Sequence, residues 1–339
     1  MKSVFVYCEI EDNKVAEISL ELLSAGKRLA EKLGAPLEAM VIGHDLESVP
    51  NQISAYGVDK IHLADDKRLY PYTTLPHAAI AGSLLKKYDP QIVLLGATSI
   101  GRDLAPRLAS KLNCGLTADC TILDIGDHYV AKEKKEYKDL LYAIRPAFGG
   151  SIIANIINWD MHPQMATVRE GVMKKEIFDN TYQSQVEQVD VNSIVTNTDF
   201  VVDVIERHIE KSDVNLKEAP IIVAGGYGVG SKENFNLLYD LAKVLGGDVG
   251  GSRAAVDAGY ISHDRQIGQT GVTVRPKLYI AAGISGAIQH TAGMQEASLT
   301  ISINNDPDAP MNDLADYVIH GDLMEVIPKM IASYKKNAK

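Results

Sequence analysis

The 339-residue chain lacks several features that would place it in a specialised class of protein. Its three cysteines, Cys8, Cys114 and Cys120, form no CxxC pair. They are too few for the thiolate set of an iron–sulfur cluster and odd in number for a disulfide framework. No apolar run approaches the roughly 20 residues that span a bilayer, and residues 1–9 are too short and too soon acidic for a secretion signal. We expect reduced thiols, no membrane insertion and a cytoplasmic location.

Positive charge is also scarce, because 34 Lys and Arg face 44 Asp and Glu, for a formal charge of −10. Binding to nucleic acid or an anionic membrane needs an excess of Lys and Arg on some face, so neither partner is expected. The remaining composition, 46% hydrophobic and 23% charged, is that of an ordinary globular protein. The length suffices for two domains with substantial cores.

Short apolar runs alternate with helical patterns in two parts of the chain. The first series has candidate strands at Val4–Cys8, Leu37–Ile42, Lys60–Leu63 and Ile92–Gly96, and a second series begins at Pro220. Such alternation predicts parallel βαβ units. The predicted fold class is α/β, with two domains that are each a mostly parallel, Rossmann-like sheet flanked by helices.

We place the domains at residues 1–207 and 208–339. Polar residues accumulate over residues 182–199, and we interpret about 182–207 as a linker that continues into a charged connector at 206–218. Extended segments are expected from about 127 to 173. Within them, the charged run Lys132–Glu136 is interpreted as a solvated hairpin.

A glycine cluster, Gly225–Lys232, follows the first strand of the second series. In a Walker A loop lysine precedes the Ser or Thr, whereas Lys232 follows Ser231, and the glycine spacing is not GxGxxG. Glycines still allow successive backbone N–H groups to crowd around an anion. The residues alone leave two alternatives open, a phosphate cradle and a tight structural turn.

A second loop, Ala282–His290, has two glycines around Ser285 and leads into a helix whose first amides are free. A single histidine in such a helix is usually a structural residue. Small and polar residues also follow the other strands of this domain, which favours one extended ligand across the strand ends. GxSxG and HExxH motifs are absent. The chain is therefore expected to hold a cofactor that carries the chemistry.

Residues 252–322 closely resemble the alpha subunit of electron transfer flavoproteins. The matching blocks are Ser252–Gly259, Gly268–Gly271, Pro276–Ala281, Gly283–His290 and Ile303–Pro310. The N-terminal half is similar to the same family in Leu95–Thr98, Gly101–Arg107, Leu116–Asp119 and Arg145–Ala147. The resemblance therefore covers essentially the whole chain.

This resemblance implies a fold, a cofactor and partners. The C-terminal domain would be flavodoxin-like (DHS-like) and bind one FAD non-covalently. The N-terminal domain would pack against a beta subunit in an obligate heterodimer. The protein would be an electron carrier between flavin dehydrogenases, such as acyl-CoA dehydrogenases, and a further acceptor.

The resemblance also assigns roles to residues. Thr270 would lie near flavin N5, His290 near the N1/C2=O edge and Arg253 beside the ring, and positive charge there would favour a reduced, anionic flavin. Ser285 and the amides around Gly286 would take phosphate or ribityl oxygens, whereas Asn304 and Asp322 would hold the adenosine end. The expected cofactor-binding residues are Tyr227, Ser252, Arg253, Gln266, Ile267, Gly268, Gln269, Thr270, Ser285, Gly286, Ala287, Ile288, Gln289, His290, Asn304, Asp322 and Leu323; no catalytic or metal-binding residue is expected.

Two residues depart from the family pattern, because Tyr227 stands where many members have Arg and Asn305 where they have Lys. Both changes remove a cation near the expected cofactor. A more specific alternative is an electron-bifurcating, NADH-dependent complex with a second FAD on the beta subunit. A remote alternative is an adenine-nucleotide-binding protein without redox chemistry, and an NAD-dependent dehydrogenase is disfavoured by the glycine spacing.

Overall fold

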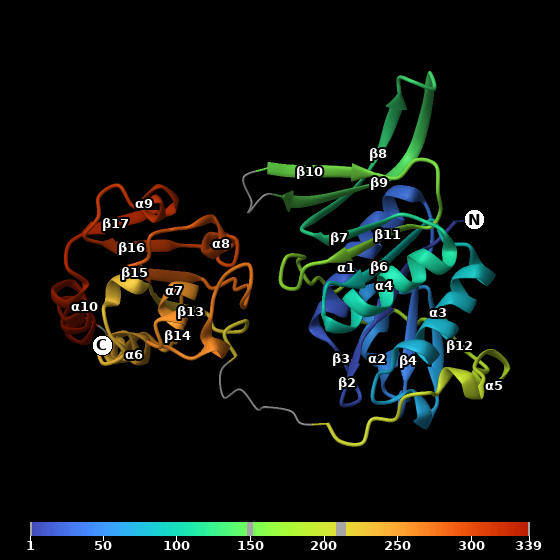
Figure 1. Cartoon of the computed structure of the whole chain (residues 1–339), viewed down its shortest axis with the longest axis horizontal. Coiled ribbons are helices and arrows are strands. Elements are labelled where there is room, and N and C mark those ends of the chain that lie inside the picture. The colour runs from blue at the N-terminus through green and yellow to red at the C-terminus, as the bar shows by residue number, and fades with distance from the viewer. Residues whose placement is uncertain (1, 148–151, 208–214, 338–339) are drawn as a thin grey trace. The chain divides into compact units, whose positions relative to one another are not determined.

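The computed structural model describes residues 2–147, 152–207 and 215–337. These residues divide into two compact units, one ending at Arg207 and the other beginning, among the described residues, at Asn215 (Figure 1). Both units are built on parallel sheets flanked by helices, which confirms the predicted fold class. The charged connector expected over 206–218 lies mostly outside the described residues. No described helix has the length and apolar content to cross a bilayer.

The first unit contains a seven-stranded sheet in which every neighbouring pair is parallel. In spatial order its strands are β12 (Gln185–Gln188), β5 (Lys60–Asp65), β4 (Leu37–Gly43), β1 (Val4–Cys8), β6 (Ile92–Gly96), β11 (Gln164–Val168) and β7 (Leu116–Cys120). Side chains of β1 alternate between two cores, so Val4 and Val6 face one side and Phe5 and Tyr7 the other. One core is covered by α1 (Glu17–Leu33) and α2 (Val49–Ile53), the other by α3 (Thr74–Tyr88) and α4 (Ser99–Leu112).

The stretch expected as a linker begins with ordered structure instead. Strand β12 pairs with β5 at the edge of the sheet, and the short helix α5 (Val191–Ile194) follows it. Glu187 of β12 forms ion pairs with Lys60 and Lys87. The strand resembles a linker in sequence because most of its side chains are exposed and polar, so hydrophobic alternation does not mark it.

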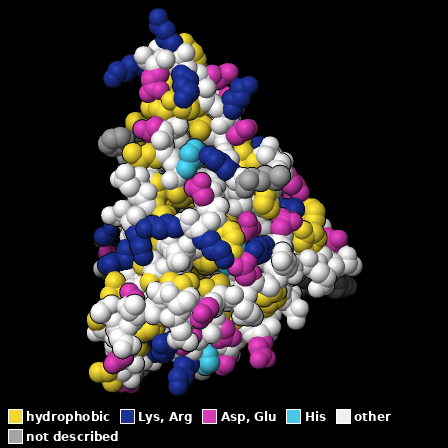
Figure 2. Space-filling model, turned by 90° about the vertical axis from the view of Figure 1, so that its right-hand side faces the viewer, with side chains coloured by type: hydrophobic (Ala, Val, Ile, Leu, Met, Phe, Trp, Pro, Cys, Tyr) yellow, Lys and Arg dark blue, Asp and Glu magenta, His cyan; other side chains and the backbone are white. Residues whose placement is uncertain are grey.

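A separate antiparallel sheet, in the order β10-β9-β8, belongs to the first unit. Strands β8 (Ile122–Val130) and β9 (Lys135–Ala147) form the long hairpin predicted for the charged run, and β10 (Ile152–Ile157) pairs with β9. Figure 2 shows Lys and Arg side chains at the projecting end of this hairpin. A two-strand hairpin of β2 (Ile10–Glu11) and β3 (Lys14–Val15) follows β1.

The second unit is a five-stranded parallel sheet. Its strands lie in the order β14 (Asp248–Gly251), β13 (Ile221–Gly225), β15 (Leu278–Ala282), β16 (Thr300–Asn304) and β17 (Tyr317–His320). In chain order this is 2-1-3-4-5, the order of flavodoxin-like sheets. Helices α6 (Phe235–Leu245) and α10 (Leu323–Asn337) pack on one face. Three short helices follow strand ends, α7 (Arg253–Asp257), α8 (Ile288–Thr291) and α9 (Pro310–Leu314).

Candidate functional site at the carboxyl edge of the second sheet

The order of the second sheet reverses between β13 and β15, which are neighbours although β14 lies between them in the chain. In open α/β sheets ligands bind outside the carboxyl ends of the strands at such a reversal. The loops that leave these two strands contact each other here. Gly226 N–H donates to the Ala282 carbonyl (2.9 Å), and Gly228 N–H donates to the Gly283 carbonyl (3.1 Å).

Glycine is required where these two loops cross. A Cβ added to Gly226 would lie 2.0 Å from the carbonyl oxygen of Gly283, and Gly283 itself has φ +61°. Side chains at these positions would force the loops apart, because real Cβ atoms do not approach backbone that closely. The glycine cluster therefore brings two strand-end loops into contact, and the N–H groups of Gly226 and Gly228 are used in that contact, which favours the structural alternative.

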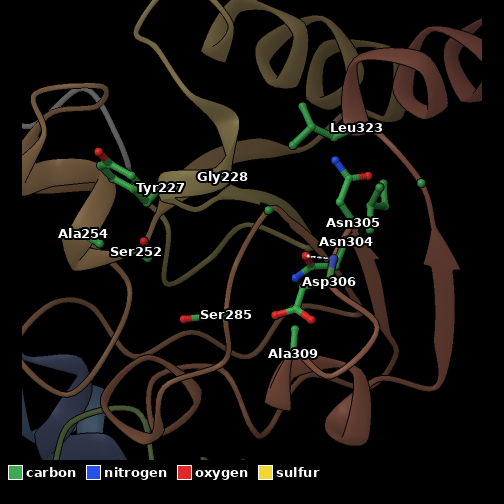
Figure 3. A pocket seen from close by; sticks show the side chains of 13 residues that line it. Tyr227, Gly228, Ser252, Ala254, Ser285, Asn304, Asn305, Asp306, Ala309 and Leu323 are labelled. Atoms are coloured by element: carbon green, nitrogen blue, oxygen red, sulfur yellow. Dashed lines mark hydrogen bonds between the residues drawn. The ribbon is translucent and has the colours of Figure 1, made fainter.

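A pocket of about 290 Å³ lies beside this crossing (Figure 3). Five of the expected residues line it, namely Tyr227, Ser252, Ser285, Asn304 and Leu323. They come from the ends of four strands and the start of α10, so the fold gathers residues far apart in the chain. The space is near the lower limit for small-molecule sites, which suits one end of a dinucleotide better than a whole one.

The asparagine in this pocket shapes the loop that follows β16. Asn304 Nδ2 donates to the Ile284 carbonyl (2.9 Å), and Asn304 Oδ1 accepts from Asp306 N–H (3.1 Å). Figure 3 shows Asn304, Asn305 and Asp306 together on one side of the pocket, with Tyr227, Ser252 and Ala254 on another. Both ends of the Asn304 amide are engaged, so the side chain fixes the pocket wall.

A second group of expected residues lies outside this pocket, and hydrogen bonds connect its members to one another and to the sheet. The loop 266–271 is tied to β14 by Ile267 N–H, which donates to the Gly251 carbonyl (2.9 Å), and to α8 by Gln269 N–H, which donates to the Gln289 carbonyl (2.6 Å). Gln266 Nε2 donates to Thr270 Oγ1 (3.1 Å). Because Ile267 is hydrogen-bonded to Gly251, the last residue of β14, the loop also lies at the carboxyl edge of the sheet.

His290 differs from the expectation of a positively charged group. Its side chain is buried, and both ring nitrogens are engaged, Nε2 with the Tyr279 hydroxyl (2.9 Å) and Nδ1 with the Ile267 carbonyl (3.1 Å). Burial lowers the pKa of His290 to about 4. The ring is therefore neutral at pH 7. Its hydrogen bond to the Ile267 carbonyl supports the 266–271 loop.

The other expected residues fall into exposed and structural positions. Arg253, the first residue of α7, is 70% exposed, and its Nε lies 3.4 Å from Asp257. Gln269, Thr270, Ala287, Ile288 and Gln289 are also exposed. Asp322 accepts from Met324 N–H (2.8 Å) at the start of α10. Gly268 and Gly286 both have positive φ, at +145° and +88°, and a Cβ on Gly286 would meet the backbone of Met311 at 2.2 Å.

Several pocket residues are not among the cofactor-binding residues expected from the sequence. They are Gly228, Ala254, Gly283, Ile303, Asp306, Ala309 and Gly321, together with Asn305, which the sequence analysis placed near the cofactor only as a departure from the family pattern. Asp306 is the one charged side chain among the described lining residues. The polar run Asn304–Asp306 after a strand could have indicated the pocket wall. The small residues leave space for the pocket, and no sequence motif marks them. Among the described residues no group of three or more His, Cys, Asp or Glu is placed to hold a metal.

Known proteins match both units of the chain. The family model described as electron transfer flavoprotein domain matches residues 4–194, and the model described as electron transfer flavoprotein FAD-binding domain matches residues 215–295. An electron transfer flavoprotein subunit alpha of Thermoanaerobacterium thermosaccharolyticum is 46% identical over 336 residues, which cover 99% of this chain and 98% of that protein. The protein FixB of Clostridium saccharobutylicum is 48% identical, with coverage of 99% and 97%.

A third relative carries a more specific description. It is the acryloyl-CoA reductase electron transfer subunit beta of Anaerotignum propionicum, 40% identical over 357 aligned positions that cover 99% of this chain and 97% of the relative. All three matches run through both units of the chain.

Proposed function

Because the chain belongs to the electron transfer flavoprotein alpha-subunit family, we propose that it binds one FAD at the carboxyl edge of its second sheet and carries electrons as a heterodimer with a beta subunit. The observation that carries this proposal is the convergence of Ser252, Ser285 and Asn304 on one pocket beside the crossed glycine loops. FAD would supply the redox chemistry, and the protein would bind and orient it.

The donor set suits a dinucleotide. The Ser285 side chain is exposed at this edge, and Ser252, which is buried and accepts from Ala255 N–H at the start of α7, places a hydroxyl in the pocket wall. No Lys, Arg or His is among the described residues that line the pocket, so phosphate oxygens would be held by hydroxyls and N–H groups. Arg253 and Thr270 are exposed at the same edge of the sheet and are available to a flavin ring that extends beyond the pocket.

A heterodimer is supported by an apolar sheet face in the first unit. In the three-stranded sheet, Ile122 pairs with Ile144 and Ile153 pairs with Pro146, and these residues point to the same face. Ile122 is 52% and Ile153 71% exposed. The opposite face contributes Leu141 and Ala143 to the core. An exposed apolar face of this kind suits a protein partner, and family membership makes that partner the beta subunit.

The redox partner is proposed from one relative's description. A protein 40% identical to this chain is an electron transfer subunit of an acryloyl-CoA reductase. We therefore propose an oxidoreductase of acyl-CoA thioesters as the partner of this chain. The bifurcating alternative requires a second FAD on the beta subunit.

The test is the flavin content of the purified heterodimer. Co-expression with the beta subunit is expected to give a yellow complex, and flavin released by denaturation is counted per heterodimer. One FAD supports simple electron carriage, and two support bifurcation. A colourless complex that does not bind added FAD would refute the proposal. A complex that binds AMP or ADP but no FAD would instead establish the adenine-nucleotide alternative.

A further inference from the structure

Three aromatic rings connect the core of the second unit to the rim of its pocket. Tyr227, in the turn after Gly226, lines the pocket and is 64% exposed. Its ring stacks on Tyr260 with centroids 5.8 Å apart and planes inclined by 22°. Tyr260 in turn packs on Phe235 at 6.3 Å, and Phe235 is fully buried in the core. We call Phe235, Tyr260 and Tyr227 the aromatic column.

Two rings of the column, Phe235 and Tyr260, are held in place by backbone contacts. Phe235 lies beneath the glycine loop, because a Cβ added to Gly225 would meet its ring at 2.5 Å. Tyr260 N–H donates to the Ala255 carbonyl (2.9 Å) directly after the α7 helix, which carries Ser252 at its N-cap and Ala254 on the pocket wall. The middle ring therefore joins the α7 helix to the glycine loop that carries Tyr227, on the same side of the pocket.

We propose that Tyr260 is a positioning residue, which holds the Tyr227 ring at the pocket rim as a wall for a planar heteroaromatic ring of the bound dinucleotide. An exposed tyrosine has several rotamers, and fixing it on binding costs conformational entropy. Stacking on Tyr260 removes that freedom before the ligand arrives, and preorganisation of this kind raises affinity without a new ligand contact. Tyr260 is not among the residues that line the pocket, so it acts through Tyr227.

A tyrosine at position 227 offers the ligand a flat apolar face, and it needs a second ring behind it to stay in place. Aromatic pairs contribute about 0.5–1.5 kcal/mol beyond their buried area. Loss of the pair is therefore expected to weaken binding by roughly two- to tenfold.

The test is a double-mutant cycle on the affinity of the heterodimer for FAD, measured by titrating the flavin-free complex and following flavin fluorescence. This inference rests on the proposed function, and FAD binding by the wild-type complex establishes that function first. Tyr227→Ala and Tyr260→Ala are each expected to weaken binding by roughly two- to tenfold. The double variant is expected to be no weaker than Tyr227→Ala alone, within about twofold.

Conservative and matched variants separate positioning from folding. Tyr227→Phe and Tyr260→Phe keep the rings and are expected to bind FAD as the wild type does. Tyr239→Ala removes another aromatic ring from the hollow that Tyr260 also lines, but Tyr239 packs against Arg265 (5.4 Å). It is expected to leave the affinity unchanged within about twofold.

Two results would overturn the inference while leaving the proposed function intact. One is a Tyr260→Ala complex that binds FAD as tightly as the wild type. The other is a double variant whose loss is the product of the single losses, because Tyr260 would then act independently of Tyr227. Titration with ADP and with riboflavin 5′-phosphate identifies the ring that meets Tyr227, as only the ligand that carries that ring should lose affinity in Tyr227→Ala.

Discussion

The Tyr279 hydroxyl lies 2.9 Å from Nε2 of His290, and the two residues fix each other's hydrogen-bonding state. The Ile267 carbonyl near Nδ1 can only accept, so Nδ1 carries the proton and Nε2 accepts from Tyr279. Burial raises the pKa of Tyr279, which keeps the hydroxyl protonated as a donor. The pair connects β15 to the 266–271 loop, which presents Gln269 and Thr270 to solvent.

Tyr279→Phe is expected to destabilise the second unit without changing its packing. The variant removes the donor and leaves the buried Nε2 of His290 without a partner, which costs about 1–3 kcal/mol. Chemical denaturation at pH 7 measures the free energy of unfolding. Tyr317→Phe removes an exposed hydroxyl from β17 and serves as the control, with an expected change below about 0.5 kcal/mol. Equal stabilities of the two variants would contradict the hydrogen-bond assignment.

A second histidine in the first unit has the same surroundings. His77 Nε2 is 2.9 Å from the Leu69 carbonyl, and its Nδ1 is 2.8 Å from the Tyr7 hydroxyl. Burial lowers the pKa of both His77 and His290 to about 4, against 6.5 in the unfolded chain. Each ring is thus neutral in the folded state, and unfolding allows it to take up a proton below about pH 6.5.

The free energy of unfolding is therefore expected to fall as the pH decreases from about 6.5 to about 4, by on the order of 3 kcal/mol for each histidine. Nitrogen-15 NMR of the imidazole rings is the direct measurement. His290 should keep its neutral Nδ1–H form at pH 5.5, and His77 its neutral Nε2–H form, with the exposed His320 as the internal reference. Protonation of either ring at that pH in the folded protein would contradict the geometry.

Glu9 is expected to make the free energy of unfolding depend on pH in the opposite direction from the two histidines. It follows β1 and is buried, and Thr98 Oγ1 donates to its Oε1 (2.7 Å) while accepting from Gly101 N–H at the start of α4. Burial raises the pKa of Glu9 to about 7, with smaller contributions from Glu170 and Glu11 and a partial reduction by the Thr98 hydrogen bond. The folded state therefore holds a proton that the unfolded chain releases between about pH 4.5 and 7.

Glu9→Gln is expected to remove this dependence. In the wild type, the contribution of Glu9 to stability is complete below about pH 4.5 and is lost as the pH rises through about 7. The difference in the free energy of unfolding between variant and wild type should grow by on the order of 2–3 kcal/mol over that interval. Glu47→Gln alters an exposed carboxylate and is the matched control. A difference that stays flat with pH would show that Glu9 does not titrate in this range.

Strands with a continuous apolar pattern were predictable, and strands without one were not. Val4–Cys8 and Leu278–Ala282 carry β-branched or aromatic residues and form β1 and β15. Strand β14 contains Gly250 and Gly251, and glycine normally weakens a strand. Here the glycines admit neighbours, because a Cβ on Gly250 would lie 2.3 Å from Ile267 and one on Gly251 2.7 Å from Ile261.

The candidate site was predictable as a set of strand-end loops, but its internal contacts were not. Ser285 and Asn304 each follow a strand, so the parallel order brings them to one edge. The neutrality of His290 depends on Tyr279 and Ile267, which lie 11 and 23 positions away in the chain. The pairing of Tyr227 with Tyr260 likewise depends on where the chain lies after β14 and α7, and no local sequence pattern predicts it.

Gly226→Ala is expected to disrupt the crossing of the two glycine loops. Its Cβ would lie 2.0 Å from the Gly283 carbonyl, and that atom belongs to backbone and cannot turn away. Strands β13 and β15 would separate at their carboxyl ends, and the heterodimer should lose FAD affinity by at least about tenfold. Gly82→Ala, inside α3, meets only the flexible Lys111 side chain and should retain FAD and fold at least as stably. Unchanged FAD binding by Gly226→Ala would contradict the role of the crossing.

Arg253→Ala is expected to separate the redox role of this side chain from any role in folding. Arg253 is 70% exposed and contacts Asp257 at 3.4 Å, and a surface pair of this kind contributes little. The free energy of unfolding should therefore change by less than about 0.5 kcal/mol.

The same variant tests the redox role. Arg253 and His290 were the two groups proposed to place positive charge beside the flavin, and because His290 is neutral, only Arg253 supplies it. One charge-assisted hydrogen bond of about 1.5–3 kcal/mol corresponds to roughly 60–130 mV for one electron. The potential of the bound flavin should fall by up to that amount in Arg253→Ala and much less in Arg253→Lys, as measured by reductive titration against reference dyes. Equal potentials for wild type and Arg253→Ala would place the guanidinium away from the ring.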